Sequence, residues 1–137
     1  MSTVGFTGTR QGMTAAQRIT VKEILMKEQP SMARHGDCIG ADAEFHKICL
    51  DIFVRVLLHP CNLVAQRAFC KGALTEYPTK PPLDRNRDIV NNSDFMIATP
   101  GEYNEVLRSG TWATIRYANS ARKRLYLITP DGKIERR

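Results

Sequence analysis

The sequence lacks any long hydrophobic run. Its apolar stretches, such as Ile52–Leu58 and Phe95–Ala98, are far shorter than the roughly 20 residues that a membrane-spanning helix requires. The chain also does not open on a basic segment followed by an apolar one, the pattern of a secretory signal. We therefore expect a cytoplasmic protein that makes no membrane contact.

Paired metal-ligand motifs are missing as well. The four cysteines, Cys38, Cys49, Cys61 and Cys70, form no Cys-x-x-Cys pair, and no two histidines stand at ligand spacing. Without a secretory signal, the thiols are expected to be reduced. Cys49 lies on the apolar face of an expected helix and is interpreted as a core residue. No metal and no cofactor are predicted.

Several catalytic and nucleotide-binding signatures are also absent. No Gly-Lys-Ser/Thr closes a Walker A loop, no standard Gly-x-Gly-x-x-Gly occurs, and there is no Gly-x-Ser-x-Gly elbow. Positive charge is in excess, with 20 Lys and Arg against 14 Asp and Glu. A basic surface attracts polyanions, but the basic segments contain no interleaved aromatics for base stacking, which disfavours nucleic acid as the partner.

What the sequence does contain is a regular alternation of short apolar runs and longer amphipathic segments. This pattern predicts βαβ units and a parallel sheet. We expect one α/β domain over 1–137, a Rossmann-like three-layer sandwich with a mainly parallel sheet of about five strands. The expected strands are Thr3–Thr7, Ser31–Arg34, Arg55–Leu58, Asp94–Ala98 and Leu125–Thr129.

The expected helices separate these strands. The first follows a Thr14–Gln17 capping box and ends near Glu28. The second begins at Asp42, interpreted as its N-cap. Two short helices are expected at Ala65–Lys71 and Arg85–Asn92, and a longer one at Thr111–Arg122.

A glycine- and hydroxyl-rich loop follows the first strand. Its main-chain N–H groups and the dipole of the following helix can face an anion, and glycine lets the main chain approach a phosphate closely. The candidate ligand-binding residues of this loop are Gly5, Thr7, Gly8, Thr9 and Arg10. The alternative interpretation is an ordinary turn between strand and helix.

A second loop of this kind follows the second strand and supplies the candidates His35, Gly36, Asp37, Gly40 and Asp42. Asp37 could accept hydrogen bonds from ribose hydroxyls. Asp42 and His46 share a helix face and could form an acid–base pair. For His46 we favour a satisfied surface role, whereas for His35 and Asp37 the structural and functional interpretations remain open.

Three further motifs complete the candidate set. His59 lies at the end of an expected strand. The Arg85-Asn86-Arg87 segment could form a cationic clamp for phosphates. Residues 109–114 begin a helix and could form a second anion-binding site. Trp112 could stack on a base, although a single tryptophan more often packs in a core. The candidates of these motifs are His59, Arg85, Asn86, Arg87, Ser109, Gly110, Thr111, Trp112 and Thr114.

These motifs, taken in order along nearly the whole chain, resemble the SLOG superfamily, and within it the YspA-like, DUF2493-type stand-alone domains. The resemblance implies a Rossmann-like sheet and a nucleotide-derived ligand. Its members include phosphoribohydrolases that activate cytokinins, called LOG, and the DNA-processing protein DprA. In LOG enzymes a catalytic glutamate closely follows the glycine-rich motif, whereas here Thr114 is followed by Ile-Arg-Tyr-Ala. Hydrolysis by that mechanism is therefore not expected.

The leading hypothesis is a protein that binds an ADP-ribose-like or cyclic nucleotide signal and acts as a sensor or a sequestering protein, for example in phage counter-defence. A first alternative is a nucleotide hydrolase or N-glycosidase that uses Asp37, Asp42 or Glu102 as its acid. A second is a DprA-like nucleic-acid binder, suggested by the net charge of +6. The resemblance also implies that the chain pairs into a homo-oligomer.

Overall fold

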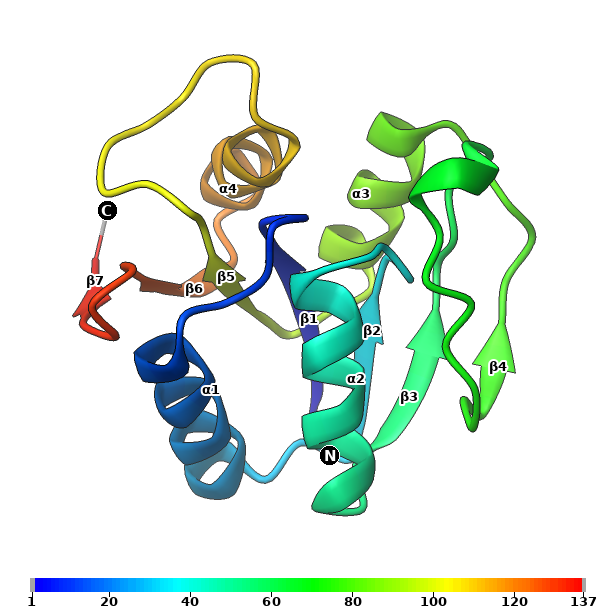
Figure 1. Cartoon of the computed structure of the whole chain (residues 1–137), viewed down its shortest axis with the longest axis horizontal. Coiled ribbons are helices and arrows are strands. Elements are labelled where there is room, and N and C mark those ends of the chain that lie inside the picture. Colours follow the sequence, from blue (N-terminus) through cyan, green and yellow to red (C-terminus); the bar gives the residue numbers. More distant parts are fainter. Residues whose placement is uncertain (1, 137) are drawn as a thin grey trace.

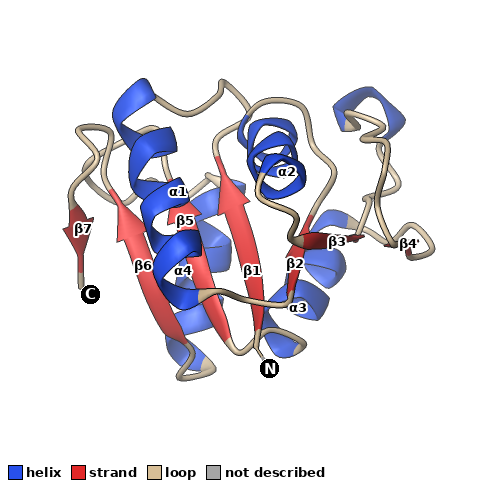
Figure 2. Cartoon of the chain, turned by 90° about the horizontal axis from the view of Figure 1, so that it is seen from below, coloured by secondary structure: helices blue, strands red, loops and turns tan. Residues whose placement is uncertain are grey.

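The computed structural model describes residues 2–136, which form a three-layer α/β arrangement. A central sheet has helices α1 and α2 on one face and α3 and α4 on the other (Figures 1 and 2). The α-helices are α1 Ala15–Glu28, α2 Ala41–Asp51, α3 Pro82–Asn91 and α4 Gly110–Ser120. The strands are β1 Thr3–Gly8, β2 Met32–His35, β3 Arg55–Leu58, β4 Thr75–Glu76, β5 Phe95–Thr99, β6 Arg124–Ile128 and β7 Ile134–Glu135.

The strand order β4-β3-β2-β1-β5-β6-β7 determines where a ligand can bind. Neighbouring strands are parallel, except that β7 runs antiparallel to β6. The chain builds outward from β1 through β2, β3 and β4, and then crosses to the other side of β1 to form β5. Ligands of open α/β sheets bind beyond the carboxyl ends of the strands at such a reversal, which here lies between β1 and β5.

The expected Rossmann-like fold is confirmed, with differences in detail. The five predicted strands correspond to β1, β2, β3, β5 and β6, with bounds that agree to one residue. The two additional strands, β4 and β7, have two residues each and lie at the sheet edges. Strands this short carry too little periodicity to be identified from sequence.

The helix bounds show how local chemistry sets each start. The Thr14–Gln17 capping box forms as predicted at the start of α1. Helix α3 begins three residues earlier than expected, because Pro82 occupies its first turn, where the missing N–H of proline costs nothing. The predicted helix Ala65–Lys71 is wrong: only a single 3-10 turn, Val64–Gln66, forms there.

Apolar side chains fill both layers between helices and sheet. On the α1/α2 face the core includes Phe6, which stacks on Phe45 with ring centroids 4.2 Å apart. Cys49 lies fully buried in the same cluster, as predicted. On the α3/α4 face the core includes Met96 and Trp112. Among the described residues, no helix is both long and apolar enough to cross a membrane.

Candidate functional site

A pocket of about 390 Å³ opens at the sheet reversal, where β1 and β5 end. This volume lies in the range of small-molecule sites. Segments far apart in sequence meet around it: the loop after β1, the loop after β2 that leads into α2, the start of α3 and the start of α4. Of the predicted site residues, those lining it are Thr7, Gly8, Thr9, Arg10, Gly36, Asp42, Arg85, Asn86, Ser109, Gly110 and Thr111.

The loop after β1 is held tightly against the start of α2. The Thr9 carbonyl accepts from the N–H of Ala41 at 3.0 Å and from that of Gly12 at 3.2 Å. Gly40 makes this approach feasible, because it adopts φ +91° and a Cβ there would lie 2.2 Å from the Arg10 carbonyl oxygen. Gly40 thus does not line the pocket but positions the loop that does.

The N-terminus of α4 points free donors at the same pocket. Ser109 caps the helix through its Oγ, which accepts from the Trp112 N–H at 3.2 Å. The N–H groups of Gly110 and Thr111 have no acceptor within the described residues. A helix start with unpaired N–H groups favours an anion, as the sequence predicted for this segment.

Two exposed arginines add positive charge at the pocket. Arg10 and Arg108 both line it, and neither forms an ion pair or side-chain hydrogen bond within residues 2–136. The two carboxylates of the lining are Asp42 and Glu102. Sequence reasoning missed Arg108, although an arginine directly before a helix-opening Ser-Gly was a signal that could have identified it. It also missed Gln66, which an irregular segment brings to the pocket.

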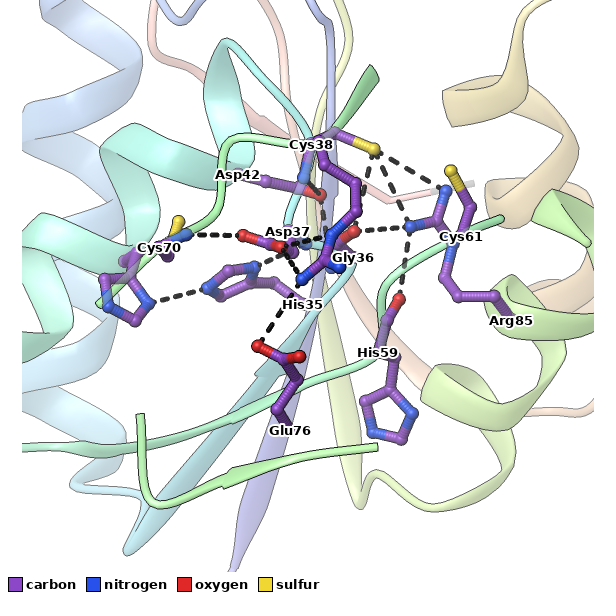
Figure 3. A network of polar contacts seen from close by, with 12 residues as sticks. His35, Gly36, Asp37, Cys38, Asp42, His59, Cys61, Cys70, Glu76 and Arg85 are labelled. Carbon is purple, nitrogen blue, oxygen red and sulfur yellow. Dashed lines mark hydrogen bonds and ion pairs between the residues drawn. The ribbon is translucent and has the colours of Figure 1, made fainter. Parts of the chain in front are cut away.

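Arg85 lines the pocket but is almost wholly buried, at 6% exposure. Its Nη1 donates to the Gly36 carbonyl at 2.6 Å and to the His59 carbonyl at 3.2 Å (Figure 3). A Cβ on Gly36 would lie 2.2 Å from Nη1, so a larger residue there would displace the Arg85 guanidinium. Arg85 is therefore a fixed part of the wall that joins two strand ends to α3.

The predicted clamp of Arg85 and Arg87 does not form. Arg87 is exposed, lies outside the pocket lining, and places its guanidinium 5.6 Å from the ring centre of Tyr117 on α4. Residues two positions apart on a helix do not share a face, so Arg85 of this pair turns inward and Arg87 outward.

Asp42 is an unusual carboxyl group in the pocket. The sequence predicted Asp42 as the N-cap of α2, but Gly40 occupies that position. The Asp42 Oδ2 instead accepts from the N–H groups of Gly36 and Cys38, each at 3.1 Å. Burial raises the pKa of Asp42 to about 6, against the opposing effect of the Arg85 charge. Burial also raises the pKa of the Cys38 thiol to about 11, so this thiol stays protonated.

Asp37 supports the fold and is not available for the contact with a ribose that the sequence suggested. It is fully buried, its Oδ2 accepts from Nε and Nη2 of Arg67 at 3.0 and 2.8 Å, and its Oδ1 accepts from the Cys70 N–H at 2.8 Å (Figure 3). Both carboxylate oxygens are therefore engaged inside the protein. Asp37 ties the irregular segment 61–81 to the loop after β2, and the same contact brings Gln66 to the pocket.

His35 and His46 form a buried relay. His35 Nδ1 accepts from the Asp37 N–H at 2.9 Å, so its proton resides on Nε2, which faces Nδ1 of His46 at 2.9 Å. His46 Nε2 in turn lies 2.7 Å from the Lys71 carbonyl oxygen. Burial lowers the pKa of His35 and keeps it neutral. His46 is satisfied, as expected, but it is buried rather than on the surface.

This relay also bears on metal binding. The ligand atoms of His35, His46 and Cys70 lie within 4.8 Å of one another. A metal ion there would require a free lone pair on His35 Nε2. The hydrogen bond that His35 Nδ1 accepts places the proton on that nitrogen. The residues therefore fit a hydrogen-bonded chain better than a metal centre.

The remaining predicted residues lie outside the pocket lining. Trp112 is 1% exposed and packs in the core, so it cannot stack on a base; its Nε1 donates to Glu102 at 2.9 Å. Thr114 donates to the Gly110 carbonyl. Gly5 lies within β1, and His59 lines a neighbouring cavity.

Comparison with known proteins identifies relatives by structure only. No protein-family model and no curated protein matches the chain. A molybdenum cofactor binding protein from the phototrophic bacterium Rippkaea orientalis matches with a TM-score of 0.71 and 13% identity, over 93% of this chain and 76% of that one. The structural-genomics target TM1055 matches with a TM-score of 0.68 and 15% identity, over 93% and 74% of the two chains.

A third match is DNA processing protein A from Helicobacter pylori, described for its mode of binding single-stranded DNA. It has a TM-score of 0.63 and 21% identity, over 92% of this chain and 64% of that one. Identities this low show the fold alone. The comparisons agree with the Rossmann-like fold that the sequence predicts.

Proposed function

We propose that the protein binds a small nucleotide-derived ligand, an ADP-ribose-like or cyclic nucleotide signal, in the pocket between β1 and β5, and acts as a sensor or sequestering protein. The observation that carries this proposal is the convergence of residues 7–11, Arg85 and residues 108–111 on one pocket at the sheet reversal. Free helix N–H groups and two unpaired arginines there are suited to phosphate oxygens.

The charges suggest how such a ligand would be held. Its phosphates would lie against the N–H groups of Gly110 and Thr111, with Arg10 and Arg108 balancing the charge. Asp42, on the opposite side of the sheet reversal, would accept a hydrogen bond from a sugar hydroxyl or a base N–H. This assigns Asp42 the polar role that the sequence suggested for Asp37.

Native mass spectrometry of the purified protein, followed by titration calorimetry with ADP-ribose and cyclic dinucleotides, tests the proposal. We expect one ligand per pocket, and at least about a tenfold loss of affinity in an Arg10→Ala/Arg108→Ala double variant, because charged hydrogen bonds are lost. Arg87→Ala is the matched control, since Arg87 is exposed but outside the pocket. Equal affinity in both variants would contradict the proposal.

A second candidate function rests on Asp42. A carboxyl group with a pKa near 6 in a ligand pocket can act as a general acid or base, which favours a nucleotide hydrolase or N-glycosidase. Incubating each bound nucleotide with the protein and analysing it after denaturation distinguishes the two functions. A binder returns the ligand intact, whereas a hydrolase releases products that an Asp42→Asn variant does not form.

The fold similarity to a DNA-binding protein motivates a third test. Nucleic-acid binding predicts an affinity that falls steeply with salt, with a slope of about −0.7 per phosphate contacted on single strands. A compact pocket predicts a shallow slope, because it holds only a few phosphates. Fluorescence anisotropy with a labelled oligonucleotide over a salt series gives this slope.

A further inference from the structure

A second cavity, of about 450 Å³, lies between α3 and the chain segment that follows β4. It is separate from the first pocket, and Arg85 forms part of the wall of both. Arg34 of β2, His59 after β3, Tyr77 and Lys80 contribute to its lining. The proposed function makes no use of these side chains other than Arg85.

Arg34 is the notable group in this cavity. Its Nη1 lies 2.9 Å from Nε2 of His59, while its Nε is enclosed and has no hydrogen-bond partner. No carboxylate pairs with Arg34 within the described part of the chain. Arg34 therefore brings to the cavity wall a positive charge that no carboxylate of residues 2–136 neutralises, and such a charge attracts an oxyanion.

The neighbouring groups leave the positive charge of Arg34 uncompensated. Burial and the Arg34 charge lower the pKa of His59 to about 4, so its ring is neutral and accepts from Arg34. Lys80 is paired with Asp88 at 2.5 Å, and Arg85 donates to carbonyl oxygens of the protein. The lining therefore carries a net positive charge, and the Arg34 Nη2 has no acceptor within residues 2–136.

The walls of the cavity are largely apolar. The Tyr77 ring stacks on that of His59 with centroids 4.6 Å apart and 25° between planes, and the Arg34 guanidinium lies 5.8 Å from the Tyr77 ring centre. Pro60 and Pro78 complete the apolar surface. Flat rings and prolines bury an apolar body well, whereas a phosphate-rich ligand would find only one free cation.

We propose that this second cavity binds a small carboxylate with an apolar body, with its carboxylate paired to Arg34 and its body packed against Tyr77. A guanidinium pairs with a carboxylate through charge-assisted hydrogen bonds, and no hydrogen bond engages the Arg34 Nη2 within residues 2–136. The site does not depend on the ligand of the first pocket, since its own residues supply the charge and the walls.

Three small probes test this proposal on the full chain by ¹H–¹⁵N shift mapping. Two of them each lack one feature of the first. Benzoate carries both features, acetate lacks the apolar body, and benzamide lacks the charge. We expect saturable benzoate shifts centred on Arg34, His59, Tyr77 and Lys80, weaker binding of acetate, and none of benzamide. Equal binding of benzamide, no benzoate binding, or shifts centred on Gly8 and Gly110 would each overturn the proposal.

Variants then test whether Arg34 supplies the positive charge that binds benzoate. Arg34→Gln should weaken benzoate at least about tenfold, whereas Arg87→Gln, which removes an exposed arginine outside both pockets, should not. Should Arg34→Gln fail to fold, Tyr77→Leu provides the second variant, because Tyr77 is 37% exposed and its loss leaves the core intact. Unchanged benzoate affinity in a folded Arg34→Gln or Tyr77→Leu protein would contradict the site.

Discussion

At the scale of single residues, two glycines of the first pocket have different roles. One allows the pocket wall to pack, and the other lies where a ligand would bind. Gly36 and Gly110 both line it. A Cβ on Gly36 would lie 2.2 Å from the Arg85 guanidinium, whereas a Cβ on Gly110 would meet nothing within 4 Å. An alanine at the first position would therefore push against the Arg85 side chain, whereas an alanine at the second has room and can report on ligand binding.

Gly36→Ala is predicted to lower the free energy of unfolding by about 1–3 kcal/mol, because overpacking displaces Arg85 from its two carbonyl acceptors. Urea denaturation monitored by circular dichroism measures this loss. A fully stable Gly36→Ala protein would show that the Arg85 wall can relax, and would remove the structural role given to this pair.

Gly110→Ala should instead leave stability unchanged or slightly higher, since alanine favours helix over glycine. Its methyl group would hinder the approach of an oxyanion to the free N–H groups of α4. We expect affinity for the nucleotide-derived ligand to fall about tenfold with no decrease in the melting temperature. Calorimetry of both proteins tests this prediction. Undiminished affinity would show that the phosphate does not bind at the N-terminus of α4.

At the scale of elements, the irregular segment 61–81 depends on one buried ion pair for its position. Asp37 accepts from the Arg67 side chain and from the Cys70 N–H, and main-chain bonds join Ile39 to Gln66 and Ala68 to Asp37. Asp37 itself adopts φ +54°, a conformation that aspartate tolerates better than most residues.

Asp37→Ala is predicted to destabilise the protein by about 3 kcal/mol, because Arg67 loses both hydrogen bonds to a buried carboxylate and keeps only the exposed Glu76 at 3.4 Å. Since the pair anchors segment 61–81, amide hydrogen exchange should increase most at residues 66–70 and least in β1 and β5. Mass-resolved exchange measures both. Uniform acceleration across the sheet would show that Asp37 supports the whole fold rather than this segment.

At the scale of the whole molecule, the sequence predicted the fold better than the site. Alternating apolar and amphipathic segments identify β1, β2, β3, β5 and β6, because each strand is buried and flanked by turn residues. The same patterns place glycine and hydroxyl residues at one end of the sheet, where many of them do line the pocket.

Side-chain direction was not available from sequence. Asp37 and Trp112 were predicted to face a ligand, yet both lie inside the protein. Arg85 and Arg87 were expected to act together, but the helix turns them apart. Spacing along the chain does not reveal that the irregular segment 61–81 folds back to engage Asp37, since this contact depends on a tertiary ion pair.

Stability should fall as the pH decreases from about 6.5 toward about 4. Burial holds the pKa of His35 well below its ordinary value and that of His59 at about 4, so in this range the unfolded chain binds protons that the folded one does not. Asp42, with a pKa of about 6, takes up a proton in the folded chain below that pH and so stabilises it. This gain offsets the loss of stability caused by one of the two histidines.

Urea unfolding at about pH 7.5 and about pH 5 measures this change, and each pKa unit corresponds to about 1.4 kcal/mol. A His59→Gln variant should lose less stability between the two pH values than the original chain, because it has one fewer group to protonate. A steeper loss in that variant would contradict the neutral state assigned to His59.

The central claim is that the loop after β1 and the start of α4 bind one ligand together. The most direct measurement is a ¹H–¹⁵N titration of the labelled protein with ADP-ribose or the co-purified nucleotide. We expect the amide signals of Arg10, Gly110 and Thr111 to shift with a single dissociation constant. Shifts confined to one of these segments, or to neither, would contradict it.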